Sequence, residues 1–238
     1  TEQERAQLAV LFDSLEMVAP LRRALRQRPH HRGSVDLRRT LRAQLRSGGE
    51  LARLRRRRSG VRRRRVVLLI DVSGSMQPYA DSLLRLAHRI VRAMPNQAEV
   101  FTIGTRLTRI SPALRVRQAD EALAAVGRLI PDWSGGTRLG EVIGAFLSRW
   151  GRRGLARSAI VVIASDGWER GDAQLLGEQM RQLRLLAYAV IWMNPHRGKP
   201  GYAPIQTGIQ ACLPHLDRMV AGHSLATFAE LLEVLANA

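Results

Sequence analysis

Hydroxyl and carboxylate side chains gather in three short loops of this 238-residue chain. The first loop reads Asp-Val-Ser-Gly-Ser and places Asp71, Ser73 and Ser75 on one side by their spacing of two. Two later loops contribute Thr137 and Asp166. Carboxylate and hydroxyl oxygens, without thiol or imidazole, form a hard donor set that suits Mg²⁺, Mn²⁺ or Ca²⁺ rather than zinc. We therefore expect a divalent-metal site, with Mg²⁺ as the first choice.

The loops adjoin elements that would bring them together. The apolar runs at 66–70 and 159–164 are typical of strands buried on both faces of a parallel sheet. The first and third loops follow these two strands directly, and the second precedes a helix that begins at Leu139. In such sheets ligands bind beyond the carboxyl ends of the strands, where the strand order reverses. The five side chains are therefore expected at one rim.

The remaining pattern alternates helices with strands. Helices are expected at 79–94, 118–129, 139–150, 173–185 and 225–235, the last capped by Ser224, and further strands at 99–104, 106–110, 187–193 and 219–221. The alternation predicts an α/β fold, a doubly wound, mostly parallel, Rossmann-like sheet flanked by helices, over residues 66–238.

Residues 1–65 form a separate, basic extension by this reading. Residues 22–65 hold 18 Arg against two acidic residues, and they account for most of the net charge of +18. Leucines spaced by three and four predict an amphipathic helix over 5–27. Asp36 is expected to cap a short basic helix that carries three leucines, and 51–65 is expected to be a linker too charged to form a core strand.

The arginine run at 53–65 leaves three interpretations open. It could be a solvated linker, it could bind an acidic protein surface, or it could bind nucleic acid or make peripheral contact with an anionic membrane. No aromatic residue interrupts the run, which weakens stacking on single-stranded nucleic acid as an explanation. Nucleic acid is therefore the less favoured partner.

Other features narrow the class of protein. No run of apolar residues is long enough to span a bilayer, and no signal-peptide pattern opens the chain, so a cytoplasmic protein is expected. The single Cys212 is expected to be a buried structural thiol. There is no Gly-x-x-x-x-Gly-Lys nucleotide loop. Asp71 at a strand end would suit a Mg²⁺-dependent phosphatase, but the second acid such an enzyme needs is Ser73 here, and we expect no catalysis.

The metal constellation resembles the metal-ion-dependent adhesion site (MIDAS) of von Willebrand factor A (VWA) domains, whose pattern is Asp-x-Ser-x-Ser, a distant Thr and a distant Asp. The corresponding residues here are Asp71, Ser73, Ser75, Thr137 and Asp166. In that family the metal bridges to a Glu or Asp of a protein partner. The resemblance therefore implies binding rather than turnover.

A wider resemblance, over about residues 30–238, is to the CoxE-like subfamily of VWA proteins. It rests on blocks such as Asp-Leu-Arg-Arg-Thr-Leu-Arg from Asp36, Asp-Trp-Ser-Gly-Gly-Thr from Asp132, and Gly-His-Ser-Leu-Ala from Gly222. Members are encoded beside MoxR-type AAA+ ATPases, and the founding member helps to mature the copper-molybdenum site of carbon monoxide dehydrogenase. The resemblance implies an adaptor between such an ATPase and a metalloenzyme client.

Three residues beside the metal loops are candidates for contact with a partner. They are Trp133, Trp168 and Arg138. Core packing is the usual role of Trp, but an exposed Trp beside a metal would serve as an anchor for a partner.

Overall fold

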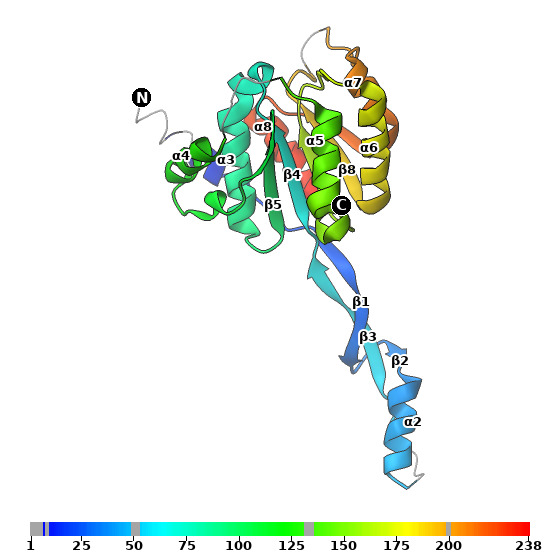
Figure 1. Ribbon diagram of the computed structural model, residues 1–238. Helices are drawn as coiled ribbons and strands as arrows, with labels where there is room; N and C mark the ends of the chain where they lie inside the picture. Colours follow the sequence, from blue (N-terminus) through cyan, green and yellow to red (C-terminus); the bar gives the residue numbers. More distant parts are fainter. Residues whose placement is uncertain (1–6, 8–9, 49–52, 131–135, 199–200) are drawn as a thin grey trace. The chain divides into compact units, whose positions relative to one another are not determined.

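The computed structural model describes residues 7, 10–48, 53–130, 136–198 and 201–238. The chain divides into two compact units, which we call unit 1 (Thr1–Pro20 and Arg64–Ala238) and unit 2 (Leu21–Arg63). The division differs from the boundary expected at residue 65, because the segment up to Pro20 belongs with unit 1. Figure 1 labels the elements of both units.

Unit 1 alternates strands and helices along the chain. Its elements are β4 (Val66–Asp71), η1 (Gly74–Met76), α3 (Gln77–Ala93), β5 (Ala98–Ile103), β6 (Leu107–Arg109), η2 (Ala113–Arg115), α4 (Ala119–Leu129), α5 (Leu139–Phe146), η3 (Leu147–Leu155), β7 (Ile160–Ala164), α6 (Ala173–Leu186), β8 (Ala189–Asn194), α7 (Thr207–Cys212), η4 (Leu213–His215), β9 (Arg218–Ala221) and α8 (Leu225–Ala236).

The six strands form one sheet in the order β6-β5-β4-β7-β8-β9. All neighbours are parallel except β6, which pairs antiparallel with β5 at one edge of the sheet. The chain passes from β4 to β5 on one side and later returns to β7 on the other, so the strand order reverses at β4. The predicted doubly wound, mostly parallel sheet is confirmed, and its reversal point lies where the metal loops were expected.

Helices cover both faces of the sheet, and alternate side chains of β4 serve two cores. Val66, Leu68 and Ile70 belong to a core with α3, α4 and α8, whereas Val67 and Leu69 belong to a core with α5, α6 and α7. Figure 1 shows α3 and α5 on opposite sides of β4. Burial on both faces explains why the strand reads as an unbroken apolar run.

Two local features of unit 1 differ from the sequence expectations. The helix expected to run to Trp150 ends as an α-helix at Phe146 and continues as the π-helix η3, in which Gly154 adopts φ 127°. The short helix α7 (Thr207–Cys212) was not predicted, because its six residues are too few to show a helical period. The last helix begins as expected, with Ser224 in a capping box.

The segment before Pro20 packs on unit 1 through its own apolar side chains. The rings of Phe12 and Phe228 lie 5.9 Å apart, and Leu15 is also buried in the core beside α3. Arg89 Nε donates to the carbonyl oxygen of Leu15 at 3.2 Å. The leucine periodicity at the start of the chain therefore reflects docking, but the helix does not extend to residue 27.

Unit 2 is a β-ribbon with one helix, and it corrects two expectations. Its elements are β1 (Leu21–His30), β2 (Ser34–Val35), α2 (Leu37–Arg46) and β3 (Arg56–Arg63). β3 pairs antiparallel with both β1 and β2. Among the described residues before Pro20 the helix ends at Asp13, so the predicted helix over 5–27 is wrong from Ser14 onward, and the predicted linker at 51–65 contains a strand. The backbone hydrogen bonds between β1 and β3 decide the structure here, against the helical spacing of the leucines. The charge of these segments does not prevent pairing, because the ribbon is largely exposed.

The short basic helix is confirmed as α2. Asp36 caps it by accepting from Arg39 N at 3.1 Å. Gly48 follows the helix with φ 69°, which is the left-handed conformation that favours glycine after a helix.

None of the helices in the described part of the chain has the length and apolar character needed to span a bilayer. Cys212 is fully buried, as expected for a structural thiol, and burial together with the charge of Glu169 raises the pKa of its thiol. A thiol in such a place packs as a small apolar side chain.

An ion pair on β5 gives a prediction about acid stability. Burial alone would raise the pKa of Glu99, but hydrogen bonds from Arg109 and Ser111 outweigh it and lower the pKa below its ordinary value of 4.5. The stabilisation from Glu99 is therefore present above pH 4.5 and is lost as the pH falls through the lower pKa of the folded state. We expect Glu99→Gln to cost about 1 kcal/mol at neutral pH, and the difference from wild type to vanish in strong acid. Urea unfolding of both proteins across this pH range is the measurement, and a difference that stays constant with pH would contradict it.

Candidate metal centre

Each expected metal ligand lies at the end of an element of unit 1. Asp71 is the last residue of β4, and Ser73 and Ser75 occupy the turn into η1 and α3. Thr137 lies two residues before α5, and Asp166 lies two residues after β7. Because β4 and β7 are parallel neighbours, their carboxyl ends meet at the same rim.

Asp71 is the centre of a hydrogen-bond network. Its Oδ1 accepts from Ser73 N at 2.9 Å and from Thr137 Oγ1 at 3.0 Å. Its Oδ2 accepts from Ser165 Oγ at 2.7 Å. Ser73 Oγ lies 3.3 Å from Ser75 Oγ. The structure thus brings four of the five expected ligands into one connected group.

Asp166 stands beside this network with one oxygen unused. Its Oδ1 accepts from Trp168 N at 3.1 Å, whereas its Oδ2 is buried without a hydrogen-bond partner among the described residues. Burial raises the pKa of Asp71, against the lowering effect of its hydrogen bonds, and the charge of Asp166 raises it further. A divalent cation would neutralise these two buried carboxylates and would give the free oxygen of Asp166 a partner.

The donor set fits a hard divalent ion. Across the described residues there is no group of three or more His, Cys, Asp or Glu side chains that could hold a metal, so a soft or imidazole site is not offered. Two carboxylates and three hydroxyls supply only oxygen, which is the preference of Mg²⁺ and Ca²⁺. The residues that would hold the ion are Asp71, Ser73, Ser75, Thr137 and Asp166.

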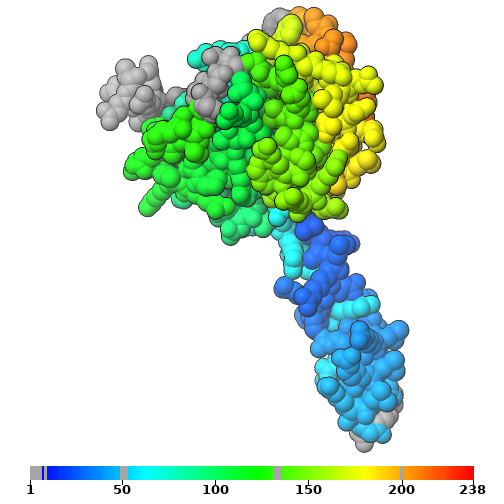
Figure 2. Space-filling model, viewed as in Figure 1, coloured from blue at the N-terminus to red at the C-terminus, as the bar shows by residue number. Residues whose placement is uncertain are grey.

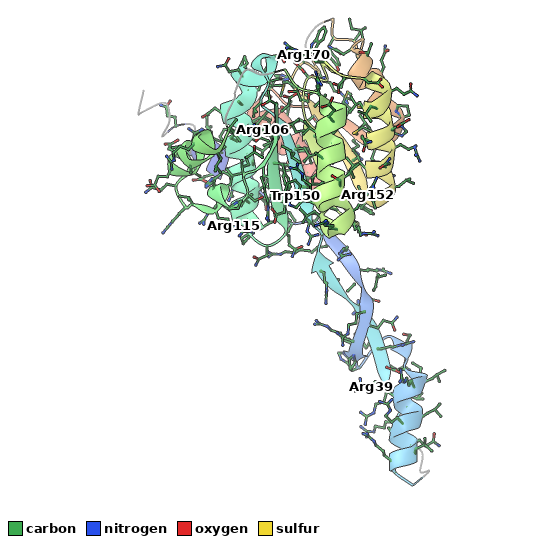
Figure 3. All side chains as sticks on the ribbon, in the orientation of Figure 1. Arg39, Arg106, Arg115, Trp150, Arg152 and Arg170 are labelled. Carbon is green, nitrogen blue, oxygen red and sulfur yellow. The ribbon has the colours of Figure 1, made fainter. Side chains whose placement is uncertain are left out.

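A hollow of about 290 Å³ opens over the site. Its lining includes the expected ligands Ser73, Ser75 and Thr137, together with Trp168 and Arg170. Figure 3 places Arg170 among the loops at this end of the sheet. A partner side chain could therefore approach the hydroxyl side of the centre from solvent.

The Arg170 side chain lies against Gly136 in the second metal loop. A Cβ at Gly136 would overlap with the Arg170 side chain, so this glycine leaves room for the arginine beside the metal site. Arg170 N also donates to Thr137 O at 3.3 Å, which ties the second and third loops together. A cation at this rim adds to the attraction for an incoming carboxylate.

The three candidate partner residues have different positions. Trp168 is 62% exposed, so it does not pack in the core and is open to a partner. Arg138 is exposed and its Nη1 lies 3.1 Å from Glu141 Oε1, outside the residues that line the hollow. Trp133 lies outside the described residues.

The sequence reading missed residues that support the ligands. Ser165 holds Asp71 Oδ2, and Trp192 Nε1 donates to Ser165 O at 2.9 Å from inside the core. Asn194 Nδ2 donates to Asp166 O at 3.1 Å. Ser165 could have been found, because it directly precedes a ligand at a strand end. The other two lie on β8, whose apolar run gives no sign of this role.

Gly167 offers a test of how tightly the third metal loop is built. Its φ is 81°, and a Cβ there would overlap with Ile209 on α7, whereas Gly201 has φ 77° and open space around it. We expect Gly167→Ala to cost about 2–5 kcal/mol, from backbone strain and overpacking together, and Gly201→Ala to cost about 1–2 kcal/mol from strain alone. Urea unfolding of the two variants measures the difference. Equal losses of stability in the two variants would mean that the third metal loop can shift away from α7 without cost.

The reversal of strand order at β4, with Asp-x-Ser-x-Ser after that strand and the Thr and Asp in the two adjoining loops, defines the class of VWA domains that carry a MIDAS motif. The family model described as "VWA domain containing CoxE-like protein" matches residues 10–228. The chain therefore belongs to the family of CoxE-like VWA proteins, and the resemblance noted in its sequence is confirmed.

Solved structures that are similar to this chain share little of its sequence. A von Willebrand factor type A protein from Catenulispora acidiphila is 15% identical with a TM-score of 0.53, over 94% of this chain and 50% of that one. Proximal thread matrix protein 1 from the mussel byssus, with a zinc-occupied MIDAS motif, is 14% identical with a TM-score of 0.48, over 72% and 46%. BatB from Bacteroides thetaiotaomicron is 18% identical with a TM-score of 0.44, over 74% and 100%.

This chain spans about half the length of the first two of these structures. The likeness to the first of them supports the fold alone. A search of the curated proteins finds no match.

Proposed function

We propose that this chain is a Mg²⁺-dependent interaction module, and that the ion at the candidate metal centre takes a further ligand from an acidic residue of a partner protein. The observation that carries the proposal is the orphaned Oδ2 of Asp166, in the loop beside the Asp71 network, together with a hollow that is lined by the other ligands Ser73, Ser75 and Thr137. A bound ion would supply positive charge to that hollow.

The chain's own residues favour binding over catalysis. Asp71 is fully buried and both its oxygens accept hydrogen bonds, so it lacks the free approach that a phosphatase nucleophile requires. Glu169, a further acid that lines the hollow, is also engaged, because its Oε1 accepts from Gly171 N and its Oε2 from Gly140 N. These contacts support a role in docking, without turnover.

The proposed partners follow from the family. We expect a MoxR-type AAA+ ATPase to be one, with a metalloenzyme such as a molybdenum hydroxylase as the client whose metal cofactor is loaded or matured. The exposed Trp168 and Arg170 at the rim suit a protein partner that presents a carboxylate next to apolar surface. A cytoplasmic location is part of this proposal.

The test is a binding titration against a purified MoxR-type AAA+ ATPase from the same organism, with Mg²⁺ and then with EDTA. Asp71→Ala and removal of the ion are each expected to weaken binding at least about thirtyfold, because either leaves the partner's carboxylate without its counter-charge. Ser75→Ala is expected to weaken it less, since the other ligands remain.

Ser148→Ala is the matched control for Ser75→Ala. Ser148 is exposed on η3 and its hydroxyl donates to Ala145 O of the preceding helix α5 at 3.1 Å, away from the metal loops, so binding should stay at the wild-type level. If neither EDTA nor Asp71→Ala weakens binding, the metal has no part in the interaction. Metal-dependent hydrolysis of phosphoesters by the wild-type chain would favour the phosphatase alternative.

A further inference from the structure

Helix α2 carries a stripe of leucines that the other described residues of unit 2 leave exposed. Leu37, Leu41 and Leu45 are 68%, 58% and 81% exposed. Their spacing of four residues places them on one side of the helix. Figure 2 shows the light-blue atoms of α2 uncovered on the side in view. Three large apolar side chains in a row on a ten-residue helix are unusual for a surface that meets only water.

One side of α2 is held against the rest of unit 2. The helix is held to the strand segment by Thr40, which is buried, donates to Asp36 O at 2.9 Å and accepts from Arg55 N at 2.9 Å. Asp36 N also donates to Arg55 O at 2.7 Å. The leucine stripe lies next to this anchored side, so it is presented in a fixed orientation.

The rest of the helix and the ribbon are strongly basic. Unit 2 holds 16 Arg against Asp36 and Glu50, a net charge of +14. Arg38, Arg42 and Arg46 are exposed on α2, one residue after each leucine of the stripe.

We infer that α2 is a docking surface for an anionic lipid membrane, in which the three leucines enter the interface and the adjoining arginines contact the headgroup phosphates. An apolar stripe flanked by arginines is the pattern of helices that lie in the plane of a bilayer surface. The net charge of unit 2 supplies the attraction to a negative surface. This inference is independent of the proposed function, since it uses no residue of the metal centre.

The alternatives fit the observations less well. A protein groove that took α2 by its leucines would also have to accommodate the exposed arginines beside them, whereas headgroup phosphates pair with those arginines directly. Nucleic acid would engage the arginines but would give the leucines no apolar partner. Both alternatives become outcomes of the test.

The experiment is cosedimentation of the full chain with vesicles of phosphatidylcholine mixed with phosphatidylglycerol, and with vesicles of phosphatidylcholine alone. We expect binding to the mixed vesicles that weakens as salt is raised, and little binding to the neutral ones. The triple variant Leu37→Gln, Leu41→Gln, Leu45→Gln is expected to lose at least about tenfold in partition. Its control is Leu185→Gln on α6, where the leucine is 75% exposed in unit 1.

A second triple variant, Arg38→Gln, Arg42→Gln, Arg46→Gln, tests the charge. It is expected to lose partition at least about tenfold, whereas Arg149→Gln, Arg153→Gln, Arg181→Gln, which removes three exposed arginines of unit 1, should lose much less. Because all the substituted side chains are exposed, the folded structure should survive, and unfolding in urea checks this.

Insertion is measured separately with a fluorescent reporter. Unit 2 contains no Trp, so Leu41→Trp and, on another side of the helix, Arg39→Trp each add a single probe to it. Brominated lipid should quench the probe at position 41 and not the one at position 39. Equal partition of the leucine variant and wild type, or binding to duplex DNA with none to mixed vesicles, would overturn the inference.

Discussion

Asp71→Asn is expected to abolish the stabilisation that Mg²⁺ gives to the wild-type chain. An ion that binds only the folded state adds about 2.7 kcal/mol at a hundredfold excess over its dissociation constant. Asp71 carries the network that aligns Thr137 and Ser73, so its loss removes both a charge and the alignment of other ligands. Urea unfolding with Mg²⁺ and with EDTA measures the effect.

In the absence of metal, we expect Asp71→Asn to change the free energy of unfolding in the opposite direction. Burial and the charge of Asp166 both disfavour the ionised form of Asp71, so the neutral amide should leave the metal-free protein as stable as wild type or more stable. Glu178→Gln, which neutralises an exposed acid on α6, should respond to Mg²⁺ as wild type does. If Mg²⁺ stabilises Asp71→Asn as strongly as wild type, Asp71 is not a ligand.

Trp192→Ala is expected to produce the largest loss of stability, about 3–5 kcal/mol. Trp192 is fully buried on β8, and its removal leaves a cavity in the core behind the third metal loop. Trp192→Phe should cost less, about 1–3 kcal/mol, because the ring volume is largely kept while Ser165 O loses its donor.

The two Trp192 variants also separate packing from support of the metal site. Ser165 links Trp192 to Asp71, so Trp192→Phe is expected to weaken Mg²⁺ binding about tenfold even where the fold survives. Urea unfolding gives the stability, and a Mg²⁺ titration of the folded variant gives the affinity. Unchanged affinity in Trp192→Phe would show that the loop holds its shape without the indole.

The sheet could be predicted because its strands are buried on both faces. The short apolar runs of β4 and β7 are typical of strands buried on both faces of a parallel sheet, and the polar loops that follow mark the carboxyl ends of these strands. The ligand set could be predicted for the same reason, since Asp71 and Asp166 follow strands that must be neighbours at the reversal point.

Unit 2 could not be predicted as a ribbon, because its pairing is carried by the backbone. Arg22 lies opposite Arg62, and Arg28 lies opposite Arg58. These like-charged pairs do not attract each other, and the strands show no apolar alternation, so the sequence does not indicate the register. The leucines at 21 and 25 continue the spacing of the preceding segment, yet they are 57% and 97% exposed on β1. The spacing of the leucines therefore predicted a helix, whereas pairing with a distant segment of the chain makes this segment a strand.

The contacts by which β8 supports the metal centre could not be predicted from the sequence, for a different reason. Trp192 and Asn194 sit in an apolar strand, and the parallel register of β7 and β8 is what aligns them with Ser165 and Asp166. A single chain gives no sign of that register. The hydroxyl and carboxylate pattern was local, whereas its support depends on long-range contacts.

The most direct test of the metal centre is anomalous diffraction from crystals of this protein grown with Mn²⁺. We predict one strong peak within the oxygen-coordination range, about 2.0–2.6 Å, of the side chains of Asp71, Ser73, Ser75, Thr137 and Asp166. Asp71→Asn crystals should lack the peak. Crystals that show no peak at this rim, or a peak that survives in Asp71→Asn, would contradict the account.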